Sequence, residues 1–197
     1  MTAATARFSA KFATERYNPV SQALHWITAV LVLTTLPIAW VMTNVADDNK
    51  LVGPLFMIHK SLGVAIFLVV AFRILWRGLD PAPPLPWTME SWEAWSARIS
   101  HFLLYLVLLG MPVSGYILSS ASNHPVSFFG LFNLPLLTEN KPLAKSAGEV
   151  HEALAYAVYF LVGLHIGATA YHLVVKRDGI LNRMLPKQVN WAGDQRK

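Results

Sequence analysis

Four stretches of this chain are long, apolar and almost free of charge, and they limit the possible fold more than any other feature. Residues 23–42 contain no Asp, Glu, Lys or Arg, and as a helix they would be about 30 Å long, the thickness of the hydrocarbon core of a membrane. Residues 99–120 and 153–175 are equally uncharged, whereas residues 54–76 carry Lys60 and Arg73 near their ends. We therefore predict an all-α fold, a transmembrane four-helix bundle, with spans at about 20–43, 54–77, 97–120 and 148–176.

Composition supports a single membrane domain over residues 1–197. Hydrophobic residues make up 54% of the chain and charged residues 14%, which is too apolar for an ordinary soluble domain or a disordered chain. A polar N-terminal arm, residues 1–18, precedes the first span, and a tail, residues 178–197, follows the last. Because a signal peptide has a shorter apolar stretch after an early basic cluster, we predict that the first span is a retained anchor.

Three local motifs add detail to these helices. Asn18 followed by Pro19 is typical of an N-cap and a first helical residue. The run Ser146-Ala-Gly-Glu149 has the spacing of a capping box and predicts the start of the fourth helix. Gly163 and Gly167 form a G-x-x-x-G motif, which predicts a helix-contact surface.

The connections between the spans differ in kind. Residues 80–86 are rich in proline and predict a short extended spacer, after which Trp87, Trp92 and Trp95 predict an interfacial stretch before the third span. Residues 121–145 form the longest connection. Its three phenylalanines either fold it over the mouth of the bundle or pack within the loop; they are Phe128, Phe129 and Phe132.

The distribution of Lys and Arg predicts the orientation of the spans. On the side that holds both termini lie twelve: Arg7, Lys11, Arg16, Arg73, Arg77, Arg98, Lys176, Arg177, Arg183, Lys187, Arg196 and Lys197. On the other side lie four: Lys50, Lys60, Lys141 and Lys145. By the positive-inside rule we predict that the N and C termini are cytoplasmic. Because these residues flank spans, the net charge of +5 records orientation, and we expect no nucleic-acid partner.

Histidines are the candidate metal ligands. The chain has no cysteine, which excludes disulfides, iron–sulfur clusters and covalently attached c-type haem. Only His124 lies in a predicted loop, and six others fall in or just beside the spans: His25, His59, His101, His151, His165 and His172. A lone histidine at membrane depth could be structural, but titratable side chains are costly there, so six together indicate function.

The spacing of these histidines predicts two pairs at different depths. His151 and His165 are fourteen residues apart, which keeps them within about 40° on one helix face and about 21 Å apart along it. His59 and His151 each lie five residues beyond the predicted outer starts of their spans, and His25 lies roughly level with His165. A macrocycle held between two helices needs one axial imidazole from each at equal height, and the sequence offers this twice.

The residues around these histidines resemble the prokaryotic cytochrome b561 family, whose members are four-helix, di-haem b membrane cytochromes. The matching segments are Arg16-Tyr-Asn-Pro-Val-Ser-Gln-Ala-Leu-His25-Trp26, Ile58-His59-Lys-Ser-Leu-Gly63, Ser100-His101 before Tyr105, His151-Glu-Ala-Leu-Ala, and Gly163-Leu-His165 through Tyr171-His172. They cover all four spans. Within the family the chain is most similar to the superoxide oxidase branch, which takes electrons from periplasmic superoxide and passes them to ubiquinone.

The resemblance implies a multi-pass protein of the bacterial inner membrane with two haem b groups. It assigns His25 and His165 to the iron of an inner haem, on the cytoplasmic side. It assigns His59 and His151 to the iron of an outer haem. It also implies that His101 and His172 flank a quinone site beside the inner haem, where an imidazole can hydrogen-bond a quinone carbonyl and relay protons. Each of these two could instead bond a haem propionate or a backbone carbonyl.

Haem propionates are anionic, so a haem site needs cationic partners. Arg73 is the best placed candidate because it lies inside the end of a span. Arg16 on the inner side and Lys60 on the outer side are further candidates for propionate or quinone contacts. All three could instead be flanking charges that follow the positive-inside rule.

We therefore expect a haem-dependent oxidoreductase that carries electrons between a periplasmic donor, for which we favour superoxide, and ubiquinone. Bis-histidine ligation leaves no open iron position, which favours electron transfer over oxygen binding. The alternatives are a quinol-oxidising cytochrome b subunit of a periplasmic redox partner, a ferric reductase, a membrane anchor and a divalent-cation carrier. A carrier usually adds intramembrane carboxylates to its histidines, and the interiors of these spans contain none.

Overall fold

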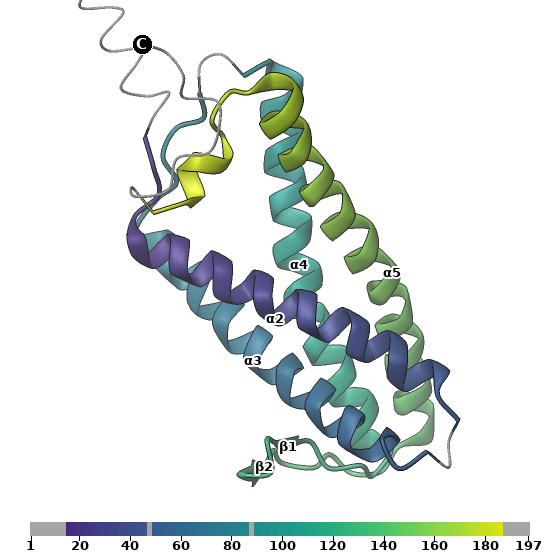
Figure 1. Ribbon diagram of the computed structural model, residues 1–197. Helices are drawn as coiled ribbons and strands as arrows, with labels where there is room; N and C mark the ends of the chain where they lie inside the picture. The colour runs from purple at the N-terminus through teal and green to yellow at the C-terminus, as the bar shows by residue number, and fades with distance from the viewer. Residues whose placement is uncertain (1–14, 47–48, 87–88, 187–197) are drawn as a thin grey trace, which may run out of the picture.

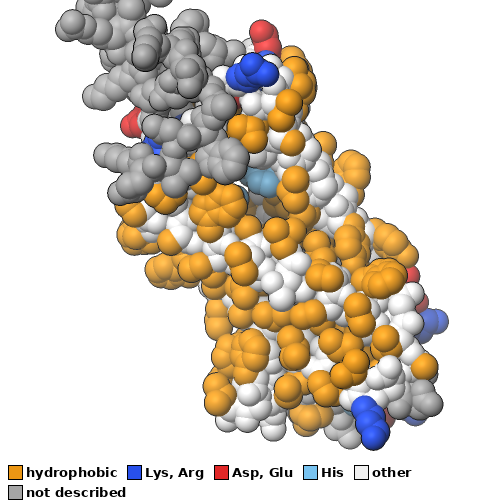
Figure 2. All heavy atoms as spheres, viewed as in Figure 1, with side chains coloured by type: hydrophobic (Ala, Val, Ile, Leu, Met, Phe, Trp, Pro, Cys, Tyr) orange, Lys and Arg blue, Asp and Glu red, His pale blue; other side chains and the backbone are white. Residues whose placement is uncertain are grey.

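Four long helices dominate the computed structural model, which describes residues 15–46, 49–86 and 89–186 (Figure 1). They are α2 (Pro19–Asn44), α3 (Val52–Leu79), α4 (Ser91–Ala121) and α5 (Lys141–Tyr171). Each is long and apolar enough to cross a membrane. On the face shown in Figure 2, apolar side chains cover the sides of the bundle and charged side chains lie at its two ends. The predicted transmembrane four-helix bundle is confirmed.

Smaller elements mark the two ends of the bundle. A two-stranded antiparallel hairpin, β1 (Ser127–Phe128) and β2 (Phe132–Asn133), lies between α4 and α5 in the chain. After α5 come a π-helical turn, η1 (His172–Lys176), and a 3-10 helix, η2 (Leu181–Met184). We call the end with β1 and β2 the hairpin end, and the end with η1 and η2 the terminal end (Figure 1).

The helices form two pairs that cross at an angle, α2 with α3 and α4 with α5 (Figure 1). Helix α3 also packs against α4 and joins the pairs. The core between them is apolar, as expected for helices that associate in lipid by close packing. Its buried residues include Val32, Ile66, Val70, Val107, Val158 and Leu161.

The start of α2 is as predicted, and the start of α5 is not. The side chain of Asn18 accepts a hydrogen bond from the Ser21 amide at 2.9 Å, and α2 begins at Pro19. The prediction that α5 starts at Ser146 is wrong, because the helix begins at Lys141. There Asn140 caps the Leu143 amide at 3.0 Å with a proline in the first turn, a stronger start signal than the capping-box spacing at 146–149.

Helix α4 begins before the uncharged stretch that predicted it. The Glu93 carboxylate accepts a hydrogen bond from the Glu90 amide at 3.0 Å, as part of a capping box that starts the helix at Ser91. Trp92 and Trp95, predicted to precede the helix, therefore lie in its first turns with exposed side chains. Trp87 lies outside the described residues.

Gly163 and Gly167 do not form the predicted helix contact. Beyond helix α5 itself, no described atom lies within 4 Å of the position that a Cβ would take at either glycine. The approach of α4 to α5 uses other glycines, because Gly110 faces Leu154 and Gly148 faces Leu118. The contact prediction is therefore wrong within this chain.

The two ends of the described chain meet at the terminal end. The buried guanidinium of Arg183 donates to the carbonyl oxygens of Glu15 at 2.9 Å, Pro83 at 3.1 Å and Pro84 at 2.8 Å. The Tyr17 amide donates to the Arg183 carbonyl at 3.0 Å. The assignment of this end to the cytoplasm and the boundaries of the spans stay predictions. Five of the basic residues behind that assignment lie outside the described residues: Arg7, Lys11, Lys187, Arg196 and Lys197.

Candidate functional site

Near the hairpin end, α3 and α5 bring two imidazoles together. The ring centres of His59 and His151 lie 6.2 Å apart, with their planes at 82°. Two imidazoles on opposite sides of one metal ion have ring centres about 6 Å apart, because each metal–nitrogen bond is about 2 Å and each ring centre lies about 1 Å further out. This pair therefore has the separation of two axial ligands.

The protonation of His151 suits metal binding. Its Nδ1 lies 3.1 Å from the Met111 carbonyl oxygen and 3.1 Å from Ser114 Oγ. A carbonyl only accepts, so Nδ1 donates to it and the proton of the neutral ring is on Nδ1. Nε2 then keeps its lone pair for a metal, as in sites where a backbone carbonyl orients a histidine ligand.

Gly115 on α4 makes room for His151. A Cβ at this position would lie 2.8 Å from Cε1 and 3.2 Å from Nδ1 of the imidazole. Any larger residue would push against the ring and against the hydrogen bonds that hold it. The requirement for a glycine here was not visible in the sequence, because Gly115 and His151 are 36 positions apart.

One ring nitrogen of His59 stands without a partner among the residues that the structure describes. Its Nδ1 is buried and has no hydrogen-bond partner within the described part of the chain. A buried polar atom left unpaired costs about 1–3 kcal/mol. The side chain thus fits a site whose remaining contacts come from a bound group.

A cavity of about 640 Å³ opens between the helices around His59 and His151. All four helices contribute to its walls, which are mainly apolar, and Ala155 on α5 is part of them. Cofactor pockets in proteins are typically apolar and about 300–1,000 Å³. The cavity is therefore large enough for a cofactor held between the two histidines.

The loop before α5 closes the hairpin end of this cavity. Ser61 Oγ donates to the Ser127 carbonyl at 3.0 Å and accepts from the Phe129 amide at 2.9 Å. Lys60 Nζ donates to the Pro125 carbonyl at 3.3 Å and also lines the cavity. The phenylalanine rings of the hairpin pack against one another, with Phe128 4.9 Å from Phe129. The loop is therefore held in place by hydrogen bonds between its backbone and side chains of α3, and not by the packing of these rings alone.

A second cluster of three imidazoles lies toward the terminal end. His25 on α2 and His165 on α5 have ring centres 6.1 Å apart. His101 on α4 lies against the same residue, 5.4 Å from the His165 ring. The separation within the His25 and His165 pair is again that of two axial ligands, and His101 stands beside it.

Arg73 occupies the space next to this cluster. Its Nη2 lies 3.1 Å from His25 Nδ1, and its guanidinium stacks 5.4 Å from the centre of the Tyr105 ring. A guanidinium only donates, so in this contact Nδ1 of His25 accepts and the proton of the ring lies on Nε2. Nε2 can bind a metal only when Arg73 has left or the ring has turned.

Hydrogen-bond donors surround a small hollow beside Arg73. It has a volume of about 10 Å³, and Trp76 and Arg77 also line it. The indole nitrogen of Trp76 is buried and has no partner among the residues described. An unpaired indole donor next to two guanidinium groups suits an anionic oxygen.

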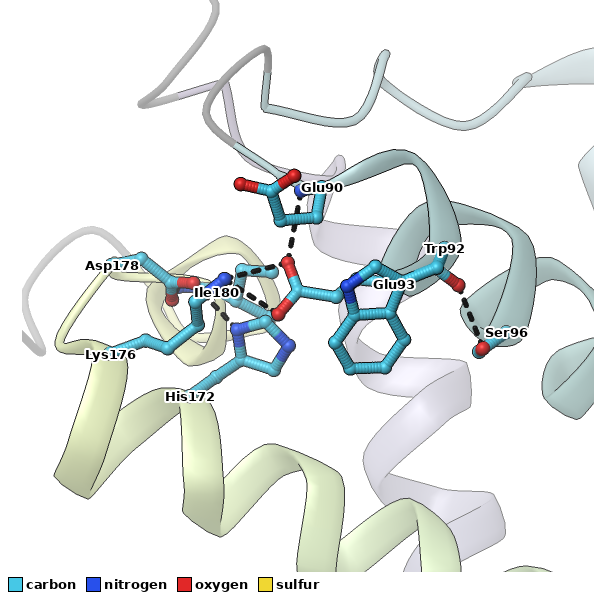
Figure 3. A network of polar contacts seen from close by, with 8 residues as sticks. All are labelled: Glu90, Trp92, Glu93, Ser96, His172, Lys176, Asp178 and Ile180. Carbon is cyan, nitrogen blue, oxygen red and sulfur yellow. Dashed lines mark hydrogen bonds and ion pairs between the residues drawn. The ribbon is translucent and has the colours of Figure 1, made fainter.

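His172 belongs to a separate polar network at the terminal end (Figure 3). Its Nδ1 lies 2.6 Å from Asp178 Oδ2. Next to it, Lys176 Nζ contacts both carboxylate oxygens of Glu93 at 2.6 and 2.7 Å. The structure thus places His172 with carboxylates and His101 with histidines. Analysis of the sequence missed the roles of Glu93 and Asp178, although a charged residue close to the end of a span is itself a signal.

Arg16 is bound to the backbone of the C-terminal segment. Its Nη1 donates to the carbonyl oxygens of Leu185 at 3.0 Å and Pro186 at 2.7 Å. These contacts link the two ends of the described part of the chain.

Among the described residues, no group of three or more His, Cys, Asp or Glu side chains is placed to hold a bare metal ion. The divalent-cation carrier therefore gains no support from the geometry, whereas a metal that brings its own macrocycle needs only one imidazole on each side.

Comparison with known proteins identifies the family. The family described as prokaryotic cytochrome b561 matches residues 16–187. Cytochrome b561 homolog 2 of Escherichia coli K12 is 33% identical over 175 residues, which cover 88% of this chain and 93% of that protein. Cytochrome b561 homolog 1 of the same organism is 27% identical over 177 residues, covering 88% and 98%.

A third relative carries a more specific name. "Probable superoxide oxidase CybB" of Yersinia pestis is 28% identical over 176 residues, which cover 88% of this chain and 98% of that protein. The family match extends through the four helices. This chain therefore belongs to the prokaryotic cytochrome b561 family, as a multi-pass oxidoreductase of the bacterial inner membrane that transfers electrons with haem b.

Proposed function

We propose that the chain binds two haem b groups, one between His59 and His151 near the hairpin end and one between His25 and His165 near the terminal end. The observation that carries the proposal is the separation of the ring centres, 6.2 Å in one pair and 6.1 Å in the other. In each pair one imidazole comes from α5 and the other from α3 or α2. The haem irons supply one-electron chemistry, and bis-histidine ligation keeps other ligands from binding.

An apolar layer separates the two proposed sites. Val158 lies seven residues from both His151 and His165, and Val32 and Ile66 lie seven residues beyond His25 and His59. The side chains of Val158, Val32 and Ile66 are all buried. Seven residues correspond to about 10 Å along a helix. These side chains, which also line the cavity around His59 and His151, would form an apolar barrier between the two haems and leave the haems as the path for electrons.

Arg73 is the proposed partner of a propionate of the inner haem. Binding of iron at Nε2 of His25 requires the proton on Nδ1, where Arg73 now donates. We infer that Arg73 turns to the propionate and joins Trp76 and Arg77 as donors. Lys60, which lines the cavity around His59 and His151, is the candidate partner for a propionate of the haem at the hairpin end. Arg16 remains a weaker candidate because its guanidinium already donates to two carbonyls.

For the reaction, we propose transfer of electrons from superoxide at the hairpin end to ubiquinone at the terminal end. Two superoxide anions give one electron each and leave as dioxygen, and one quinone takes both electrons and two protons to become a quinol. Support comes from the name of the Yersinia pestis relative and from Lys60, whose charge at the rim of the outer cavity would attract an anion. His101 and His172 are the proposed quinone contacts. Glu149, 3.9 Å from Lys145, weakens the positive field.

The hairpin supports a second candidate, electron transfer with a periplasmic redox protein. Leu131 and Phe132 at its turn are 76% and 56% exposed. Exposed apolar residues of this kind occur at contact sites between proteins. In this case the cytochrome would oxidise quinol and pass the electrons outward to the partner.

We predict that each pair of histidines holds one haem. His59→Ala and His151→Ala should each leave the same single haem per chain, and His25→Ala and His165→Ala should leave the other. The reason is that one missing axial ligand opens one site and leaves the other pair intact. Haem content measures the loss. In redox titrations, the two variants of one histidine pair should show the same midpoint potential for the remaining haem. The two variants of the other pair should show a different one.

His172→Ala is the control for this experiment, since it changes a histidine that lies outside both pairs and contacts Asp178 instead, and it should retain two haems. Two haems in any of the four ligand variants would contradict the pairing. The pairing would also be contradicted if His59→Ala and His165→Ala retained the same haem.

We predict that Gly115→Ala weakens the outer site alone. The new methyl group would displace the His151 ring from its hydrogen bonds to Met111 and Ser114. Loss of an interaction that orients a metal ligand typically lowers affinity about 10–100-fold. Haem titration of the stripped protein measures the change. Gly148→Ala, which meets Leu118 at an ordinary 3.5 Å, is the matched control, and equal affinity in both variants would contradict the role of Gly115.

We predict that superoxide reduces the haems directly. Stopped-flow mixing of the purified protein with superoxide should give reduced haem, and added ubiquinone should then reoxidise it. Superoxide dismutase, added before mixing, should abolish the reduction. Haems that are reduced no faster than in the dismutase control would rule out superoxide as the donor and favour a protein partner.

A further inference from the structure

The polar network at the terminal end contains a histidine–carboxylate pair whose role is not explained by haem binding (Figure 3). His172 Nδ1 and Asp178 Oδ2 lie 2.6 Å apart. A carboxylate only accepts a hydrogen bond, so the imidazole donates from Nδ1. Nε2 of the neutral ring is then the free, basic nitrogen.

The chain fixes the position of Asp178 by its local backbone. Arg177 is in the left-handed conformation, with φ of 52°, and Gly179 follows with φ of 75°. This turn ends the helical path of the backbone, and the Ile180 amide donates to Asp178 Oδ1 at 3.2 Å. Each carboxylate oxygen therefore has its own partner, and the one facing His172 is held in place.

The other charged groups next to His172 neutralise each other. Glu93, whose side chain is 4% exposed, accepts from Lys176 Nζ with both oxygens and from the Glu90 amide. This ion pair ties the π-helical turn that starts at His172 to the first turn of α4. Asp178 is thus the carboxylate left to interact with the imidazole.

The pair lies at a boundary between protein and water. The side chain of His172 is 12% exposed and that of Asp178 is 21% exposed. His172 is also seven residues beyond His165 on α5, about 10 Å along the helix axis. A group here can exchange protons with water and still lie close to the proposed inner haem.

We propose that Asp178 is a positioning residue that makes His172 the proton donor to the quinone; this inference rests on the proposed function. Asp178 holds one proton on Nδ1 and stabilises the imidazolium that forms when Nε2 takes up a second from water. Nε2 then gives that proton to a carbonyl oxygen of the quinone as an electron arrives. A second electron, with a second proton from water at the other carbonyl oxygen, completes the quinol.

The test separates electron entry from quinone reduction in the haem-loaded protein. In Asp178→Asn the amide no longer stabilises an imidazolium, and its NH₂ group can force the proton of His172 onto Nε2. We expect two haems per chain and reduction by dithionite or superoxide at the wild-type rate. Reoxidation by ubiquinone-1 should be slower by about 100-fold, within the range of general acid–base catalysis.

A double variant shows whether Asp178 acts through His172. Asp178→Asn should cause no further slowing in a His172→Ala background, because the group that it positions is gone. Asp80→Asn is the control, since it removes a carboxylate of the same end that accepts from Ser21 Oγ at 2.9 Å. That variant should be reoxidised at the wild-type rate.

The possible failures have different meanings. Reoxidation of Asp178→Asn at the wild-type rate, or equal slowing with and without His172, would overturn the role of Asp178 and leave the proposed function intact. Wild-type haems that ubiquinone-1 does not reoxidise would overturn both proposals.

Discussion

The cost of an imidazole inside an apolar bundle is the constraint on which this structure depends. A polar ring at membrane depth is tolerated only with partners, and here the rings lie against one another and bond to groups such as the Met111 carbonyl and the Arg73 guanidinium. Helix α5 supplies one ring to each pair, His151 and His165, so it sets both levels. Helices α2 and α3 must then present His25 and His59 at those levels, which fixes how far each helix is shifted along its neighbours.

The two pairs differ in how nearly complete they are without a cofactor. His151 already has the protonation that a ligand needs, and a cavity of about 640 Å³ surrounds its pair. His25 is instead occupied by Arg73, whose contact must break before Nε2 can bind iron. The proposed site at the hairpin end is therefore preformed, whereas haem binding at the proposed site near the terminal end would exchange a contact within the protein for a contact with the haem. The charges that this exchange needs lie at the end of the bundle, and the apolar layer at Val158 stays free of them.

Much of the fold followed from the sequence because uncharged length and helix caps are local signals. The four apolar stretches and the cap at Asn18 are of this kind, and the same cap chemistry at Asn140 outweighed the spacing at Ser146. The features that the sequence did not predict are contacts between residues that lie far apart in the chain. The space beside Gly115 depends on how α4 approaches α5, and the contact of Arg73 with His25 depends on helix rotation. Asp178 reaches His172 only through a left-handed residue, which a helix pattern does not predict.

The number of haems in the wild-type protein tests the central claim most directly. Purified material, with haem b measured as the pyridine haemochrome and protein by amino-acid analysis, should contain two haems per chain. Electron paramagnetic resonance of the oxidised protein should show low-spin iron only, because every axial position is filled by an imidazole. A ratio of one or zero, or a high-spin signal from most of the iron, would contradict the account.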